Sequence, residues 1–375
     1  MDTFIAVNQP DLSGNEKKYL MQCIETGWIS SEGPFVKEFE EKFSQRVGRK
    51  YGVAVSNGSA ALDVAVKALR LPEGGEVIMP AFTIISCASA ILRAGLTPVL
   101  VDADPVTWNM DTGKIEEKIN SKTKAIMVVH IYGLPTNMTP VLEIADKYGL
   151  KIIEDAAEAH GLTCDGNACG SFGDVSTFSF YPNKHVTTGE GGMVVTDAPN
   201  IAEYCYSLRN LCFAPKRRFV HEELGFNYRL TNLQAALGVA QLERLDDFIV
   251  RKRRMGRFYH QHLSQVEDLE LPPVKTEYAE NIYWVYGIVL SDKVTFDAEE
   301  MIARLTRLNV GTRPFFWGMH EQPVFGKMGL FRGERYPVTE RISRRGLYLP
   351  SGLGVTEEQQ YRVVEAVKKA LSLRK

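Results

Sequence analysis

Residues 125–155, which determine the fold class of this 375-residue chain, read AIMVVHIYGLPTNMTPVLEIADKYGLKIIED. Two short apolar runs, at 125–130 and 152–155, flank a helical pattern at 138–148. A strand, a helix and a second strand in this order predict a βαβ unit with parallel strands and a right-handed crossover. The first run is apolar up to His130 and the second begins apolar and ends in two carboxylates; most of the predicted strands are continuously apolar, which is typical of strands that are buried on both faces.

The same alternation of strand and helix patterns continues on both sides of this unit and predicts an α/β fold with a wound, mostly parallel sheet. In such sheets, ligands bind beyond the carboxyl ends of the strands, so polar residues at those ends are candidate site residues. The other predicted strands are 52–55, 77–80, 98–102, 175–180 and 192–196, and the other helical patterns are 60–71 and 87–94.

The pattern changes after about residue 235. Residues 234–265 predict one long helix whose basic run is typical of a solvated face; contact with an acidic partner subunit or a phosphate-bearing substrate is the alternative. We therefore expect a large domain and a smaller C-terminal α/β domain, at 1–245 and 246–375. Within the smaller domain we expect short strands near 283–290 and 311–313 and an amphipathic final helix at 357–373.

Composition excludes several classes of protein. The formal net charge is -2, so no global charge favours nucleic acid or an anionic membrane as a partner. No apolar run is long enough to span a bilayer, and the first eleven residues lack a signal-peptide pattern, so we expect a cytoplasmic protein. The six cysteines have irregular spacing without CxxC, which predicts buried free thiols and no metal site.

The first motif with chemical meaning is Val55-Ser-Asn-Gly-Ser-Ala-Ala61, between a predicted strand and a predicted helix. Gly58 and Ser59 stand where that helix begins. The free backbone amides and the positive dipole end of a helix N-terminus suit a phosphate group. The alternative is an ordinary helix cap formed by serine or asparagine.

Two further motifs carry a carboxylate and a lysine. Asp155 ends an apolar strand, where a buried carboxylate needs a cation or acts as a helix cap. Lys184 follows the strand 175–180 and precedes the turn Thr188-Gly-Glu-Gly-Gly192, whose glycines would give a ligand room near the backbone. A lysine in apolar surroundings can form a Schiff base, although a lone lysine is usually a surface residue.

The three motifs together predict pyridoxal 5'-phosphate (PLP) as the cofactor. Its phosphate, its ring nitrogen and its aldehyde each need a partner, and the chain offers a phosphate cradle, a carboxylate and a lysine in that order. The dinucleotide fingerprint GxGxxG is absent after the first strand, and so is the P-loop pattern GxxxxGK. Their absence argues against a nicotinamide oxidoreductase and against ATP hydrolysis.

The chain resembles the DegT/DnrJ/EryC1/StrS family of PLP-dependent sugar aminotransferases. The resemblance is carried above all by Asp155-Ala-Ala-Glu-Ala-His160, Ser179-Phe-Tyr-Pro-Asn-Lys184 and Thr188-Gly-Glu-Gly-Gly192, and it extends over nearly the whole chain. It implies the aspartate aminotransferase type of fold (fold type I), with a seven-stranded, mostly parallel sheet in the large domain.

The resemblance also implies a role for each motif residue. Lys184 would form the Schiff base with the cofactor and then move a proton between the two carbons that exchange the amino group. Asp155 would bind the ring nitrogen, and Glu158 would lie near the ring hydroxyl. The phosphate would be held by Gly58, Ser59 and Ser179, and by Asn227 of a neighbouring subunit.

The last of these roles would make a homodimer with shared active sites obligatory. The expected reaction moves an amino group from L-glutamate to C4 of a nucleotide-linked 4-keto-6-deoxy sugar, for O-antigen or other glycan biosynthesis. Within the family the likeness is strongest to members that convert GDP-4-keto-6-deoxymannose to GDP-perosamine. A dTDP- or UDP-linked sugar, a 3-dehydratase and a non-catalytic binding protein are the alternatives.

Two positions depart from the family pattern. Ile84 stands where many relatives have an aromatic residue that stacks on the cofactor ring, and an aliphatic side chain would contribute less there. His185 follows the lysine where relatives often have a small residue. One branch of the family replaces the lysine itself by histidine and acts as a dehydratase, so the presence of Lys184 favours an aminotransferase.

Four residues are candidates for substrate binding, each with an ordinary structural alternative. Trp28 could line the sugar pocket or belong to the core, and Arg229 could bind a diphosphate or the glutamate carboxylate or hold a subunit interface. His320 could bind a sugar hydroxyl or phosphate or be a loop residue. His185 would point away from Lys184 if this segment is extended.

Overall fold

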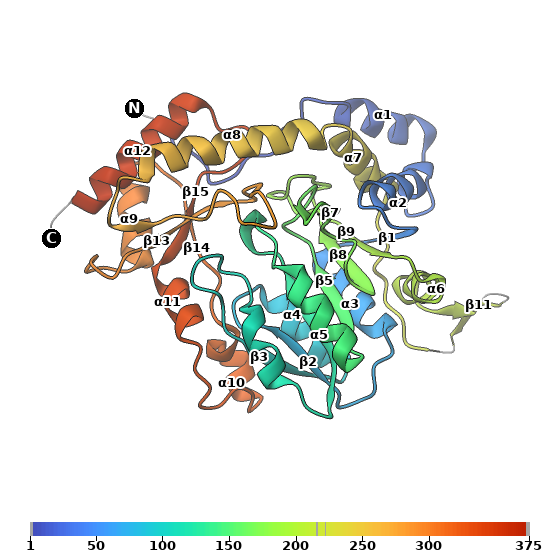
Figure 1. Ribbon diagram of the computed structural model, residues 1–375. Coiled ribbons are helices and arrows are strands. Elements are labelled where there is room, and N and C mark those ends of the chain that lie inside the picture. The colour runs from blue at the N-terminus through green and yellow to red at the C-terminus, as the bar shows by residue number, and fades with distance from the viewer. Residues whose placement is uncertain (1–2, 215–216, 222, 373–375) are drawn as a thin grey trace.

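The computed structural model describes residues 3–214, 217–221 and 223–372, and a seven-stranded sheet forms its centre (Figure 1). The strands of this sheet are β1 (Tyr51–Val55), β2 (Glu76–Pro80), β3 (Thr97–Val101), β4 (Thr123–Val129), β5 (Lys151–Asp155), β8 (Val175–Ser179) and β9 (Gly192–Thr196). Their spatial order is β1-β9-β8-β5-β4-β2-β3. Only β9 runs antiparallel to its neighbours. These are the seven predicted strands, so the mostly parallel α/β sheet is confirmed.

Helices cover both faces of the sheet, and strand residues alternate between them. In β4, Ala125, Met127 and Val129 belong to one apolar cluster, while Ile126 and Val128 belong to the other. This period of two is why the run is apolar throughout. The first cluster includes residues of α3 (Gly58–Ala68), α4 (Ile85–Arg93) and α6 (Pro199–Arg209), and the second residues of α2 (Pro34–Arg46), α5 (Met138–Tyr148) and α7 (Asn232–Leu242).

The long helix predicted at 234–265 is two helices, α7 and α8 (Leu245–Leu263), so the prediction of one helix was wrong. Arg244 between them has φ -112° and ψ 6°, outside the helical range. Its guanidinium binds Asp11 at 3.2 Å, so the N-terminal segment fixes the turn. α7 packs against α2 and α1 (Glu16–Thr26), whereas α8 packs against α12 (Glu357–Ser372). The break therefore comes from tertiary contacts.

A second, four-stranded antiparallel sheet lies in the C-terminal part of the chain. Its order is β12 (Leu269–Glu270), β13 (Tyr286–Leu290), β15 (Gly346–Leu349) and β14 (Arg313–Pro314), and it packs with α9 (Ala298–Arg307), α11 (Pro337–Arg345) and α12. The N-terminal segment joins this part, because the amide of Ile5 donates to the Asn309 carbonyl at 2.9 Å. The domain boundary between residues 245 and 246 stays a prediction.

The basic run on α8 is not uniformly solvated, which corrects the interpretation from sequence. Lys252 is only 3% exposed, and its ammonium donates to the Trp284 carbonyl at 2.7 Å and to the Ser351 carbonyl. Arg251 binds Asp11 at 2.6 Å. In Figure 1, α8 runs from α7 to α12 along one side of the molecule, and these contacts attach it to the C-terminal sheet.

The remaining short elements lie around the two sheets. They are β6 (Thr163–Cys164), β7 (Asn167–Ala168), β10 (Phe213–Ala214), β11 (Arg217–His221) and α10 (Pro323–Lys327). Among the helices in the part of the chain described, none is both long and apolar enough to cross a bilayer. All six cysteines fall within that part, and each is buried with a free thiol.

Candidate active site

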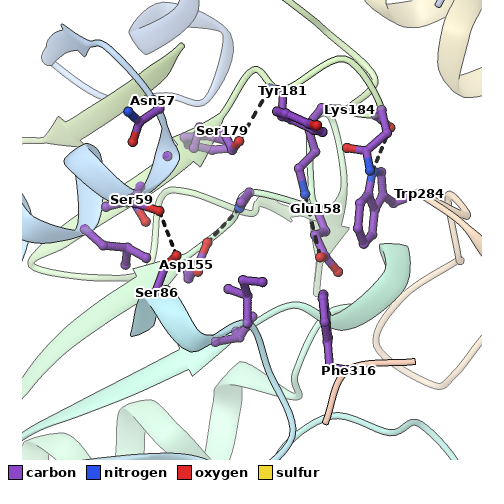
Figure 2. A pocket seen from close by; sticks show the side chains of 18 of the residues that line it. Asn57, Ser59, Ser86, Asp155, Glu158, Ser179, Tyr181, Lys184, Trp284 and Phe316 are labelled. Carbon is purple, nitrogen blue, oxygen red and sulfur yellow. Dashed lines mark hydrogen bonds and ion pairs between the residues drawn. The ribbon is translucent and has the colours of Figure 1, made fainter. Parts of the chain in front are cut away.

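A cavity of about 630 Å³ opens at the edge of the main sheet where β1, β5 and β8 end (Figure 2). Ser59, Asp155 and Lys184 all line it, so the fold brings together the three motifs that are separate in the sequence. This is the position expected from the topology, because the carboxyl ends of parallel strands meet at one edge of the sheet. Glu158 and Ser179 line the same cavity.

One end of the cavity combines a helix N-terminus with serine hydroxyls, groups that suit a phosphate. Helix α3 begins at Gly58, directly after Asn57, whose side chain caps the helix by accepting a backbone hydrogen bond at 2.8 Å. Ser59 and Ser86 place their hydroxyls 2.7 Å apart at this end. A Cβ at Gly58 would lie 2.7 Å from the Ser179 Cβ, so only glycine allows this approach. The sequence offered a helix cap and a phosphate site as alternatives for this motif. The two are compatible, because Asn57 caps the helix while the serine hydroxyls stay available to a ligand.

The glycines after Lys184 allow a close backbone contact and a turn within the chain. Gly192 pairs with Val55 in the sheet, and a Cβ there would lie 2.4 Å from the carbonyl oxygen of Asn57. Gly192 therefore makes room for the loop that starts α3, whereas the sequence suggested room for a ligand. Gly189 has φ +79°, a conformation that favours glycine, and it turns the chain back into β9.

Asp155 forms the floor of the cavity at the end of β5. Its Oδ1 accepts from the Ala157 amide at 3.0 Å, and its Oδ2 accepts from the Cys87 thiol at 3.2 Å. Burial raises the pKa of Asp155 above its usual value, and these hydrogen bonds, with the charge of Lys184, oppose that rise only in part. A cation in contact with this carboxylate would stabilise its charged form, and the protonated ring nitrogen of PLP is such a cation.

Lys184 and Glu158 form a buried pair beside Asp155. The Lys184 Nζ lies 3.6 Å from the Glu158 Oε1, and the Glu158 Oε2 accepts from the Tyr132 amide at 2.8 Å. Burial raises the pKa of Glu158 to about 7, against the opposing charge of Lys184. Burial lowers the pKa of Lys184, against the charges of Glu158 and Asp155. The two shifts bring the pKa values of the carboxyl and the amine closer together, which favours proton exchange between them.

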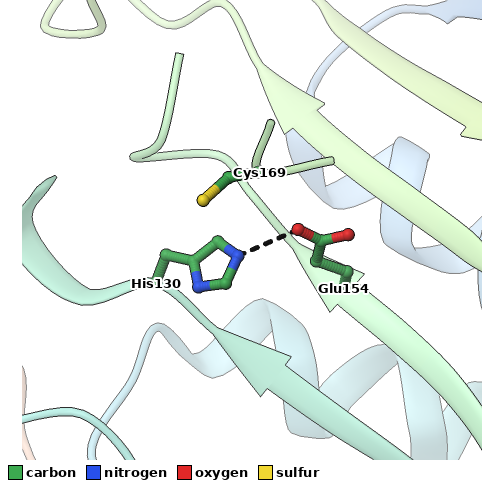
Figure 3. Close-up of side chains that lie close together, drawn as sticks. All are labelled: His130, Glu154 and Cys169. Carbon is green, nitrogen blue, oxygen red and sulfur yellow. Dashed lines mark hydrogen bonds and ion pairs between the residues drawn. The ribbon is translucent and has the colours of Figure 1, made fainter. Parts of the chain in front are cut away.

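A second buried cluster lies on the opposite face of β5, where Glu154 meets His130 and Cys169 (Figure 3). One Glu154 oxygen accepts from the His130 Nε2 at 2.9 Å, and the other accepts from the Ser176 hydroxyl at 2.8 Å. The His130 Nδ1 accepts from a backbone amide at 3.2 Å. Glu154 also receives the backbone amides of Gly170, Phe172 and Gly173. Since these polar atoms already have partners, the cluster stabilises the fold.

The four predicted substrate residues are not among the residues that line the cavity. Trp28 is 48% exposed, and Arg229 donates to the Asn210 side chain at 2.6 Å. The His320 side chain is 4% exposed and lies beside Glu340, with 3.2 Å between its Nε2 and a carboxylate oxygen. His185 is 1% exposed, and its Nε2 lies 3.4 Å from a backbone carbonyl oxygen. A direct role of the two histidines in binding gains no support from this geometry.

Asn227 also lies outside the cavity of its own chain. It is exposed and pairs with Asn210 in an isolated β-bridge. This bridge follows the hairpin of β10 and β11, which extends from the edge of the molecule near α6 (Figure 1). The side chain therefore does not contribute to the phosphate cradle of its own subunit.

Sequence reasoning missed much of the cavity wall. Trp284, Phe316 and Tyr348 come from the C-terminal part of the chain and line the cavity, and Figure 2 shows Trp284 and Phe316 on the side away from Asn57 and Ser59. No spacing rule connects these aromatic residues to the lysine motif, since they lie about 100 residues or more away along the chain. Ile84, singled out from sequence, does line the cavity and is 41% exposed.

Comparison with known proteins agrees with this geometry. Residues 10–368 match the model of the DegT/DnrJ/EryC1/StrS aminotransferase family. GDP-perosamine synthase from Escherichia coli O157:H7 is 39% identical over 369 residues, which cover 98% of this chain and 99% of that protein. GDP-perosamine synthase from Caulobacter vibrioides is 40% identical over 367 residues, covering 98% of each.

The fold also matches solved structures. The aminotransferase TlmJ from Streptoalloteichus hindustanus superposes with a TM-score of 0.91 at 30% identity, covering 98% of this chain and 99% of that one. The aspartate aminotransferase type of fold expected from sequence is thereby confirmed.

Proposed function

Because this chain belongs to the DegT/DnrJ/EryC1/StrS aminotransferase family, we propose that it transfers an amino group from L-glutamate to C4 of GDP-4-keto-6-deoxymannose and forms GDP-perosamine. The observation that carries the choice of sugar is the identity of 39% and 40% to two GDP-perosamine synthases over nearly the full length of each. The keto oxygen of the sugar is replaced by the amino group, and glutamate leaves as 2-oxoglutarate.

The residues of the cavity fit PLP, the cofactor of this enzyme family. The amides at the start of α3 and the hydroxyls of Ser59 and Ser179 would hold its phosphate, and Asp155 would pair with its ring nitrogen. When bound, PLP supplies the electron sink that makes the hydrogen on the amino-bearing carbon acidic. Ile84 would cover one face of the ring.

Lys184 would move that proton. Its Nζ lies beside a carboxylate whose pKa is raised to about 7, and burial lowers its own pKa, which makes its neutral, proton-accepting form easier to reach. Glu158 is held by the Tyr132 amide and would keep the amine oriented. The Lys184 side chain is only 9% exposed, so its amine has little contact with bulk water.

The first test is the visible absorption spectrum of the purified protein with PLP, before and after L-glutamate is added. A yellow band that glutamate bleaches supports the cofactor, the donor and the first half of the reaction together. Adding GDP-4-keto-6-deoxymannose should then restore the band and yield an amino sugar. Faster turnover with the dTDP- or UDP-linked sugar would reassign the nucleotide, and loss of the C3 hydroxyl without amine formation would indicate a 3-dehydratase.

We also propose a homodimer in which Asn227 of each subunit reaches the phosphate cradle of the other. Its exposure outside its own cavity supports this arrangement. Lys184→Ala and Asn227→Ala proteins should each be weakly active or inactive alone. Mixed and reassociated, they should recover about a quarter of the wild-type activity, since half of the dimers are mixed and each has one intact site. No recovery in mixed dimers would reject shared sites.

The product of such a reaction is an activated sugar from which glycosyltransferases build polysaccharide, so we propose a role in O-antigen or other lipopolysaccharide biosynthesis. Deletion of the gene should remove perosamine from the cell-surface glycan, and chemical analysis of that glycan is the test. The cytoplasmic location stays a prediction from the sequence.

A further inference from the structure

The amino group of Lys184 lies over an aromatic ring as well as beside a carboxylate. Its Nζ is 3.7 Å from the ring centroid of Trp284 and 3.6 Å from the Glu158 Oε1 (Figure 2). The face of an aromatic ring attracts a cation, most strongly for tryptophan and in a desolvated site. The charge of the amine is thus favoured from two sides, by a carboxylate after β5 and by a ring from the C-terminal part of the chain.

The indole is fixed in this position by its own contacts. Its Nε1 donates to the Asn183 carbonyl at 2.8 Å, one residue before the lysine. Its backbone carbonyl accepts from Lys252 at 2.7 Å, and its ring packs against Tyr132 and Tyr348. With 4% of the residue exposed, the ring has little freedom to move. The backbone comes so close to Gly133 that a Cβ there would lie 2.4 Å from the Trp284 nitrogen.

The contacts of Lys184 with Trp284 and Glu158 matter when its amine is not bonded to the cofactor. In a transaminase cycle the lysine is released while the amino group resides on the cofactor, and burial then favours a neutral, unanchored amine. We propose that Trp284 is a positioning residue: its ring face favours the protonated form of the Lys184 ε-amino group and anchors it beside Glu158 while that amine is not bonded to the cofactor. This inference rests on the proposed function, in which Lys184 is the cofactor lysine.

The test follows PLP capture by enzyme freed of its cofactor. Only the neutral amine attacks the aldehyde, so the rate of colour formation against pH has a midpoint that reports how firmly the cation is held. Placing tryptophans with increasing numbers of fluorine atoms at position 284 weakens the attraction of the ring and keeps its shape. We expect the midpoint to move to lower pH with each fluorine. Below the midpoint, capture should become about threefold to tenfold faster over the series.

Two substitutions provide matched comparisons. Trp284→Phe retains a weaker ring face and should shift the midpoint less than Trp284→Leu, which has none. Trp317 also carries a cation over its ring, with Arg344 at 5.1 Å, but lies outside the cavity lining, so Trp317→Leu should leave the midpoint unchanged. Folding of each variant is checked by circular dichroism, and the fluorinated series keeps the test valid if Trp284→Leu does not fold.

The outcomes separate the two proposals. If the wild-type protein never forms the yellow band with PLP, the proposed function fails. If the wild-type protein forms it and the midpoint is the same throughout the fluorinated series, Trp284 has only a packing role and this inference is rejected.

Discussion

Two neighbouring carboxylates on β5 differ in almost every respect except burial. Glu154 and Asp155 are both fully enclosed, but successive strand residues point to opposite faces of the sheet. Glu154 receives hydrogen bonds from His130 (Figure 3), and also from Ser176 and three backbone amides. Asp155 receives one backbone amide and one thiol and faces the cavity (Figure 2).

The direction of the pKa shifts follows from this difference. Burial would raise the pKa of both groups, but the hydrogen bonds and the histidine outweigh burial at Glu154, whose pKa is lowered. At Asp155 burial dominates and the pKa is raised. A buried carboxylate with complete hydrogen bonding stabilises the fold, whereas one with an incomplete set is available for a cation. Burial alone does not distinguish the two roles.

The largest effect should come from the cavity side, at Lys184. Lys184→Ala removes the group that holds and moves the proton, so we expect turnover to fall by at least about a thousandfold in a glutamate half-reaction assay. Lys151→Ala is the matched control, since Lys151 stands at the start of β5 and forms an exposed ion pair with Asp174. Turnover in the Lys184→Ala protein within tenfold of wild type would contradict the assignment.

The second prediction separates the two carboxylates directly. Asp155→Asn should lower turnover by about a hundredfold or more without loss of thermal stability. Glu154→Gln should lower the free energy of unfolding by about 3 kcal/mol, because it breaks a buried hydrogen-bonded pair, and should leave turnover of the folded protein nearly unchanged. Turnover and urea unfolding measured on both variants test this. Equal losses of turnover would abolish the distinction between the faces.

The third prediction concerns the pH dependence of stability. The pKa of Glu154 in the folded protein is below its usual 4.5. Its ionised form therefore contributes to the free energy of unfolding fully above pH 4.5, and this contribution is lost as pH falls through the folded-state pKa. Asp155 has a raised pKa, so its effect on stability has the opposite sign. The free energy of unfolding falls as pH rises from 3.8 through the pKa of Asp155 in the folded protein.

Unfolding curves of the cofactor-free protein between pH 3 and pH 7 provide the measurement. Glu154→Gln should flatten the loss of stability in acid, and Asp155→Asn should stabilise the protein at neutral pH. Identical pH profiles for the two variants would show that the surroundings of the carboxylates do not control their ionisation.

The smallest effect should come from the two thiols, one on each face. Cys87 donates to Asp155, so Cys87→Ala should weaken PLP binding by about twofold to tenfold, the worth of one hydrogen bond, and Cys87→Ser should restore it. Cys169 lies beside Glu154, and Cys169→Ala should leave PLP affinity unchanged. Equilibrium dialysis with PLP measures both, and equal affinities for the two alanine variants would mean that the Cys87 contact is incidental.

The seven strands of the main sheet could be predicted because most are short apolar or β-branched runs bounded by polar or turn residues. The break between α7 and α8 could not, since the apolar pattern continues through it and contacts of Arg244 with the N-terminal segment set the turn. The buried state of Lys252 was missed for a similar reason. A lysine within a basic run carries no local sign that two carbonyl groups will receive it.

The sequence by itself determined the order of elements, the helix start at Gly58 and the motifs of Asp155 and Lys184, because these depend on local periodicity and on residue types at strand ends. Tertiary structure alone decided which groups meet: Trp284 with Lys184, Cys87 with Asp155, and His130 with Glu154. Such contacts join segments that are far apart in the chain, and their distance and direction arise only when the sheet and its covering helices assemble.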